Sequence, residues 1–174
     1  MRLRVSLYRR MMSGVSSSSP LSLLKDQSLL RSDGFIHGAW VAAPSRFAVT
    51  DPATGQVLTQ VAELGAAEAE SSIDAANRAL PEWRAKSPKE RAAILNKWHQ
   101  LIVSNADDLA RIMTAEQGKP LAEARGEVVY GASFLEWYAE EAKRVYGETI
   151  PSNDPSKRYI VIKQPIGVCC AITP

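Results

Sequence analysis

The chain has 174 residues, 45% of them apolar and 23% charged, a composition typical of one ordinary globular domain. Its formal net charge of +2 is unevenly distributed: residues 1–25 hold five of the 21 basic side chains and none of the 19 acidic ones, so the remainder carries a net charge of −3. An acidic body without a basic patch argues against nucleic acid as a partner, and no apolar run reaches the length of a membrane span.

The first 30 residues resemble an organelle-targeting leader in composition. They are rich in Arg and Ser, and no acidic side chain precedes Asp26, which is typical of a mitochondrial or plastid transit peptide. Arg4, Arg9 and Arg10 interrupt the apolar stretch that a secretory signal needs. We therefore expect residues 1–30 to be a disordered leader that directs the protein to the mitochondrial matrix, with a plastid or the cytoplasm as alternatives. A disordered basic tail is the alternative interpretation.

Three short strands are expected after this leader, at residues 35–40, 47–50 and 56–61. The first follows an Asp33-Gly34 turn, and the second and third are separated by a turn that contains Pro52 and Gly55, where turn chemistry favours these residues. Together the strands predict a small β-meander, which is too small to be stable alone.

Two helices are expected next. The first covers about residues 66–80, with Ala69, Ile73, Ala76 and Leu80 on one face and Pro81 as its end. The second begins at Ser87, the expected N-cap, with Pro88 at the first helical position and Glu90 completing a capping box.

Two further helices follow. One is predicted from about Asn105, with two acidic residues near its positive N-terminal end, to a C-terminal stop at Gly118. The last runs from about Pro120 to Tyr146 and is the longest. It contains Gly126 and Gly131, which lower helix propensity and indicate close contact with a neighbouring element. Its acidic and basic side chains are spaced like those of a solvated helix face.

The C-terminal stretch contains two predicted strands, at residues 158–163 and 168–172. The second is apolar at every position, which is typical of a strand that is covered on both faces in a parallel sheet. Cys169 and Cys170 lie within it, and we expect them to be buried packing residues, since no base near them in sequence lowers a thiol pKa. Ligands of such sheets bind beyond the carboxyl ends of the strands, and the residues there are Ile172, Thr173 and Pro174.

Sequence motifs do not define a catalytic site. The chain has no G-x-G-x-x-G and no P-loop. His37 and His99 are far apart in sequence, so a metal site is not predicted. Two adjacent cysteines form neither a disulfide framework nor a metal site, which favours a reducing compartment. The residues alone therefore predict an α/β fold, a helical layer beside the start of a sheet, without a nucleophile, base and oxyanion donor.

Several segments resemble the NAD(P)-dependent aldehyde dehydrogenase superfamily, and within it most closely the succinate-semialdehyde dehydrogenases of mitochondria. The segments are IDAANRALPEWR at 73–84, EQGKPLAEA at 116–124, FLEWYAEE at 134–141, YGETIP at 146–151, KQPIGV at 163–168 and ITP at 172–174. The resemblance extends from about residue 35 to residue 174.

This resemblance implies the fold of the N-terminal part of such an enzyme. Residues 31–146 are then the first part of a Rossmann-like NAD-binding domain, residues 147–165 belong to a β oligomerisation arm, and residues 166–174 form the first, truncated strand of the nucleotide-binding sheet. The family forms homo-oligomers, often tetramers.

The resemblance also implies an activity. In the family a cysteine thiolate attacks the aldehyde, hydride passes to NAD or NADP, and a glutamate activates the water that releases the acid; for succinate semialdehyde the product is succinate, in 4-aminobutyrate breakdown. These catalytic residues and the oxyanion asparagine match no position of residues 1–174, so no catalytic residue is predicted here. Only Ile172, Thr173 and Pro174 match positions next to the cofactor.

We therefore expect an N-terminal fragment of such an enzyme, inactive and without bound cofactor on its own. One alternative is a non-catalytic module that pairs with full-length subunits through the strand at 158–163. A different aldehyde dehydrogenase subfamily is the other.

Overall fold

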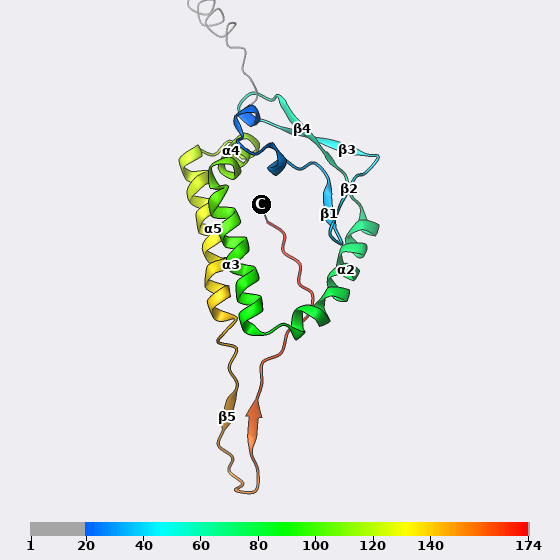
Figure 1. Ribbon diagram of the computed structural model, residues 1–174. Helices are drawn as coiled ribbons and strands as arrows, with labels where there is room; N and C mark the ends of the chain where they lie inside the picture. The colour runs from blue at the N-terminus through cyan, green and yellow to red at the C-terminus, as the bar shows by residue number, and fades with distance from the viewer. Residues whose placement is uncertain (1–19, 174) are drawn as a thin grey trace, which may run out of the picture.

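The computed structural model describes residues 20–173, and its helices and strands surround an open centre toward which the C-terminal residues run (Figure 1). Three helices, α3 (Pro88–Ser104), α4 (Ala106–Gln117) and α5 (Leu121–Glu141), form a packed layer on one side. Their contact surfaces are rich in alanine, which allows close approach: Ala92, Ala106, Ala110, Ala124, Ala132 and Ala139 are buried. His99 on α3 also lies with Nδ1 3.0 Å from the carbonyl oxygen of Ala132 on α5. The core of the described chain therefore lies between these helices.

The start of α3 confirms the predicted capping box. Ser87 Oγ accepts a hydrogen bond from the Glu90 amide at 3.3 Å, and the Glu90 carboxylate accepts one from the Ser87 amide at 2.7 Å. These hydrogen bonds hold the pKa of Glu90 below its usual value. Two of the unpaired N–H groups at the helix start are thus satisfied by local sequence alone.

We expect Ser87→Ala to lower the free energy of unfolding by about 1 kcal/mol, because the first turn of α3 loses its side-chain cap. Urea unfolding followed by circular dichroism measures the change. Ser133→Ala on α5 is the matched control: its exposed hydroxyl only donates to the Tyr130 carbonyl within the same helix, so the expected change is within about 0.5 kcal/mol. Equal effects of the two substitutions would contradict the capping role.

Helix α2 (Ala66–Ala85) continues through Pro81, so the prediction that Pro81 ends it is wrong. A proline inside a helix removes one backbone hydrogen bond, but a last turn forms beyond it. That turn is closed by the Lys86 amide, which donates to the Trp83 carbonyl, and by a Glu82–Lys86 ion pair at 3.0 Å. The predicted core face of α2 is also wrong, since Ala75 is its buried residue and Ile73 is 55% exposed.

Helix α5 ends at Glu141, five residues before the predicted end at Tyr146. Gly147, the expected stop signal, instead lies at the start of a hairpin, where an added Cβ would collide with the Val161 carbonyl. Gly126 and Gly131 within α5 face open space among the described residues, so their predicted close contacts are not present there.

The predicted β-meander is replaced by two separate hairpins. Strands β1 (Gly34–Ile36) and β2 (Ala39–Val41) pair antiparallel, as do β3 (Arg46–Thr50) and β4 (Val57–Ala62). The expected first strand folds back on itself because His37 and Gly38 both have positive φ, 51° and 79°. That pair of conformations is the one required by a two-residue hairpin turn.

Residues 20–30, expected to belong to a disordered leader, are folded against α4. They form two 3-10 helices, η1 (Pro20–Leu23) and η2 (Gln27–Leu29). Leu21 and Leu24 are buried in a cluster with Ala115, against which Leu30, Leu58 and Ile112 pack. The targeting leader predicted for residues 1–19 lies outside the described residues.

Asp108 anchors the same segment to α4. Its carboxylate is 3% exposed and accepts hydrogen bonds from the amides of Lys25 at 3.1 Å and Asp26 at 2.9 Å. The sequence predicts Asp108 only as a residue that favours the helix N-terminus, because its partners lie more than 80 positions earlier in the chain. Residues 20–30 are therefore held by both apolar burial and a buried carboxylate.

The C-terminal part of the chain forms a hairpin that projects away from the helices (Figure 1). Strands β5 (Glu148–Ile150) and β6 (Tyr159–Val161) pair antiparallel, and every one of their residues is exposed. No strand is present in residues 162–173, so the strand predicted at 168–172 is not formed. A strand requires a partner, and the described chain places none beside this segment. Among residues 20–173, no helix has both the length and the apolar character that a bilayer span requires.

Candidate functional site

The predicted cofactor residues lie at the end of the unpaired C-terminal segment. Ile172 is 95% exposed, and Thr173 is exposed beside it; Pro174 lies outside the described residues. Within residues 20–173, neither Ile172 nor Thr173 takes part in a hydrogen bond. The described chain therefore leaves their backbone groups open to a ligand but brings no second polar group toward them.

Cys169 and Cys170 are both exposed free thiols, so the prediction that they are buried packing residues is wrong. They are exposed because no strand covers the segment that contains them. Cys169 Sγ donates a long hydrogen bond of 3.8 Å to the Gly167 carbonyl, which does not activate a thiol as a nucleophile. Among the described residues, His, Cys, Asp and Glu side chains form no cluster suited to a metal ion.

The EQGKP segment forms the tight turn between α4 and α5. Gly118 has a φ of 82° and its amide donates to the Thr114 carbonyl at 2.8 Å, which is the left-handed helix end that the sequence predicts. A Cβ at Gly118 would lie 2.9 Å from Pro52 Cγ in the turn between β3 and β4. The glycine therefore satisfies both a backbone conformation and a close approach between two elements.

Charged side chains surround this turn and the adjacent helix ends. The Lys119 ammonium pairs with the Glu127 carboxylate. Arg125 Nε donates to Asp107 Oδ1 at 2.9 Å, and Lys25 Nζ lies 3.7 Å from the other oxygen. The hydrogen bond from Arg125, followed by the positive charges of Arg125 and Lys25, lowers the pKa of Asp107. These ion pairs link residues 20–30, α4 and α5.

Glu116 differs from these carboxylates because no cation lies beside it. Burial raises the pKa of Glu116 above its usual value, although solvent still reaches the side chain. No hydrogen bond or ion pair joins Glu116 to another group within residues 20–173. The sequence interprets this residue as part of a solvated helix face; the structure places it in a hollow instead.

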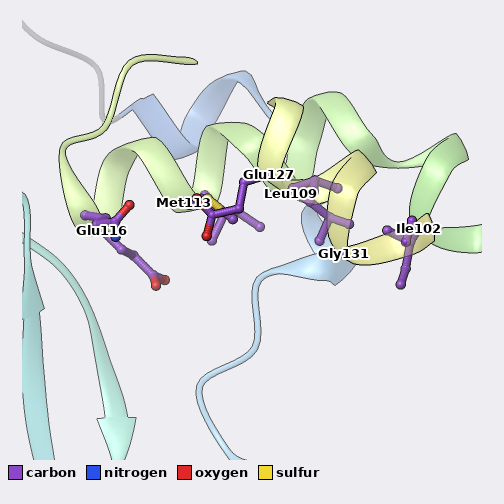
Figure 2. Close-up of a pocket in the computed structure, with 10 residues that line it drawn as sticks. Ile102, Leu109, Met113, Glu116, Glu127 and Gly131 are labelled. Atoms are coloured by element: carbon purple, nitrogen blue, oxygen red, sulfur yellow. The ribbon is translucent and has the colours of Figure 1, made fainter. Parts of the chain in front are cut away.

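That hollow is a groove of about 830 Å³ along α4 and α5, which we call the α4–α5 groove (Figure 2). This size falls within the range of about 300–1,000 Å³ that is typical of ligand sites. Its polar lining residues are Glu116, Gln117 and Glu127. Its apolar lining consists of Ile102, Leu109, Ile112, Met113, Val128 and Ala132. The missed sequence signal is the pairing of apolar residues on α4 with a glutamate one turn from the helix end.

A second hollow lies where the C-terminal segment passes the end of α2. Leu80 and Trp83 of α2 line it together with residues 162–167 and the side chains of Arg84 and Arg91. Val168 and Cys169 continue along the same helix. The C-terminal segment is thus placed by α2 before it turns toward the open centre in Figure 1.

This architecture corresponds to the N-terminal part of aldehyde dehydrogenase structures. The succinate-semialdehyde dehydrogenase structure from Burkholderia pseudomallei superposes with a TM-score of 0.82 and 56% identity, over 84% of this chain and 31% of that one. Betaine aldehyde dehydrogenase from Staphylococcus aureus, in complex with NAD⁺, superposes with a TM-score of 0.75 and 26% identity, over 83% and 29%. The predicted fold class, a mixed helical and strand chain with small open sheets, is confirmed.

The model of the aldehyde dehydrogenase family matches residues 40–174, and the chain belongs to this family. It is 58% identical over 153 residues to both glutarate-semialdehyde dehydrogenase of Pseudomonas putida and the NADP⁺ succinate-semialdehyde dehydrogenase of Escherichia coli. It is 52% identical over 147 residues to the human mitochondrial succinate-semialdehyde dehydrogenase. These matches cover 87%, 87% and 84% of the chain, but it spans only 32%, 32% and 28% of the relatives' own lengths.

Proposed function

We propose that the protein to which these residues belong oxidises a short aldehyde that carries an acid group at its far end. Succinate semialdehyde is the proposed substrate and succinate the product, in 4-aminobutyrate breakdown. The carrying observation is the 58% identity to enzymes named for the semialdehydes of glutarate and succinate. Both aldehydes end in a carboxylate and differ by one methylene, so another subfamily of similar acid-bearing substrates is the nearest alternative.

The proposed oxidant is NAD or NADP, which accepts the hydride that leaves the substrate carbon. Support comes from the NAD⁺ complex among the structural neighbours and from the NADP⁺ in the name of the E. coli relative. Ile172, Thr173 and Pro174 are the residues proposed to contact it, mainly through their backbone. The residues present fit this role, because Ile172 and Thr173 have open backbone groups on an exposed extended segment.

Residues 1–174 are proposed to be inactive by themselves. The chain spans less than a third of the length of the relatives that carry the activity. Its two cysteines are exposed on an unpaired segment instead of being held next to a base. An active site that holds a thiolate, a base and an oxyanion donor in fixed geometry requires more support than this segment provides.

Two proteins test these proposals together. The first is the 174-residue chain, and the second is a chimera in which residues 31–174 replace the matching part of the E. coli relative. We expect no NAD(P)H from the chain alone. The chimera is expected to oxidise succinate semialdehyde within about tenfold of the parent's kcat/KM, a difference of about 1.4 kcal/mol in transition-state stabilisation.

The outcomes separate the proposals. Turnover by the 174-residue chain overturns its proposed inactivity. A folded chimera that oxidises neither succinate nor glutarate semialdehyde overturns the proposed reaction, whereas a strong preference for glutarate semialdehyde moves the substrate to the neighbouring subfamily.

A second candidate function is assembly. The β5–β6 hairpin projects from the body with all its strand residues exposed, and its outer edges have no partner among residues 20–173 (Figure 1). Such edges pair readily with other strands. In this proposal the chain joins homo-oligomers of full-length subunits through β6 and carries no activity itself.

The proposed compartment is the mitochondrial matrix. It rests on the composition of the leader and on the mitochondrial relatives. Bacterial relatives are as similar as these, so the leader composition decides between the compartments.

A further inference from the structure

The α4–α5 groove exposes an apolar floor that requires a cover. Six aliphatic or methionine side chains line it, and its apolar surface is open to solvent. Contiguous apolar surface of this kind marks a site of interaction. The occupant must also satisfy the polar groups of the groove, chiefly Glu116, which has no cation beside it within residues 20–173.

The point at which the described chain begins places residues 1–19 beside this groove. Leu21 of η1 is buried in the cluster that Ile112 of α4 packs against, and Ile112 also lines the groove. The leader therefore joins the fold at the same helix that forms one wall. Nineteen residues reach up to about 60 Å when extended, while a 12-residue helix such as α4 is about 18 Å long. The leader is long enough to follow the whole groove.

The chemistry of the leader complements the groove. It contains four arginines and no acidic residue, interspersed with Leu3, Val5, Leu7, Met11 and Met12. Guanidinium groups form strong, often bidentate hydrogen bonds with carboxylates. Methionine and leucine side chains fill irregular apolar hollows well. Glu116 and Glu127 thus offer partners for arginine, and the floor offers a surface for the apolar residues.

We propose that residues 1–19 dock in the α4–α5 groove of their own chain, with an arginine against Glu116 and apolar side chains on the floor. Docking covers the groove for as long as the leader is attached, and removal of the leader opens it. An arginine beside Glu116 also relieves the cost of burying that carboxylate, which otherwise raises its pKa. This inference is independent of the dehydrogenase reaction proposed above.

Photo-cross-linking of the full 174-residue chain tests the proposal. A benzophenone amino acid replaces Leu7, the chain is irradiated, and the linked peptides are located by mass spectrometry. We expect cross-links within one chain to residues of α4 and α5 that line the groove. Glu116→Gln is expected to reduce their yield about two- to fivefold, as the loss of one partly exposed ion pair does to an equilibrium.

Glu123→Gln is the matched control, because Glu123 is an exposed carboxylate on the first turn of α5 that does not line the groove. Its cross-linking yield is expected to stay unchanged. Circular dichroism checks that both variants keep their helices, and the amide variant is nearly isosteric with glutamate. Cross-links that are scattered, that join two chains, or that persist equally in Glu116→Gln overturn the proposal. Cross-links between chains identify a second copy as the occupant.

Discussion

Replacing Asp108 with alanine is expected to lower the free energy of unfolding by about 2–3 kcal/mol. The carboxylate is 3% exposed and accepts two backbone hydrogen bonds, from Lys25 and Asp26. Hydrogen bonds to charged groups contribute about 1.5–3 kcal/mol each, and a donor left without an acceptor keeps its desolvation cost. The sum is reduced because Lys25 and Asp26 are partly reached by water.

Urea unfolding measures the loss of stability, and hydrogen exchange shows where it acts. The amides of Lys25 and Asp26 should lose protection first, since residues 20–30 detach from α4. Asp107→Ala is the matched control: Asp107 is an adjacent carboxylate in exposed ion pairs with Arg125 and Lys25, and such pairs contribute about 1 kcal/mol or less. If both substitutions destabilise the chain equally, the buried carboxylate is not the anchor.

Features that depend on neighbouring residues could be predicted from the sequence. Ser87, Pro88 and Glu90 lie within four positions of one another, and their hydrogen bonds form as the capping rule requires. Gly118 adopts the left-handed conformation expected at a helix end. In both cases the interaction that decides the structure is local, so the sequence contains all of its partners.

Features that depend on distant partners could not be predicted. The anchor at Asp108 joins positions more than 80 residues apart, and nothing near Asp108 in sequence indicates it. The strand pattern at 168–172 is strong, yet a strand forms only beside another strand, and the described chain provides none there. Its cysteines are therefore exposed, although their apolar neighbours predict burial.

The candidate site divides in the same way. The position of Ile172 and Thr173 at the end of the chain was predicted from pattern and resemblance, and their contact with a cofactor stays a prediction. The α4–α5 groove was not predicted, because Glu116 and Glu127 have the spacing of solvated carboxylates and only the packing of α4 against α5 places them in a hollow. Sequence spacing gives the face of one helix, but a groove requires the relation between two.

Gly118→Ala is the second substitution with a large expected effect, a loss of about 2–3 kcal/mol. Gly118 has a φ of 82°, and a side chain in the left-handed region costs about 1–2 kcal/mol. The new Cβ would also lie 2.9 Å from Pro52 Cγ, closer than carbon atoms normally approach. Since the proline ring cannot rotate away, the turn between β3 and β4 must shift from the end of α4, and overpacking of this kind adds about 1 kcal/mol or more.

Two other glycines separate the contributions. Gly55→Ala has a similar φ of 72° but no atom within 4 Å of the added Cβ, so it should show the backbone cost alone, about 1–2 kcal/mol. Gly126→Ala, at an open helical position, should stabilise the chain by about 0.5–1 kcal/mol. Urea unfolding of the three variants gives the order directly. If Gly118→Ala costs no more than Gly55→Ala, Pro52 yields freely, and the EQGKP turn is held by backbone conformation rather than by its contact with the hairpin.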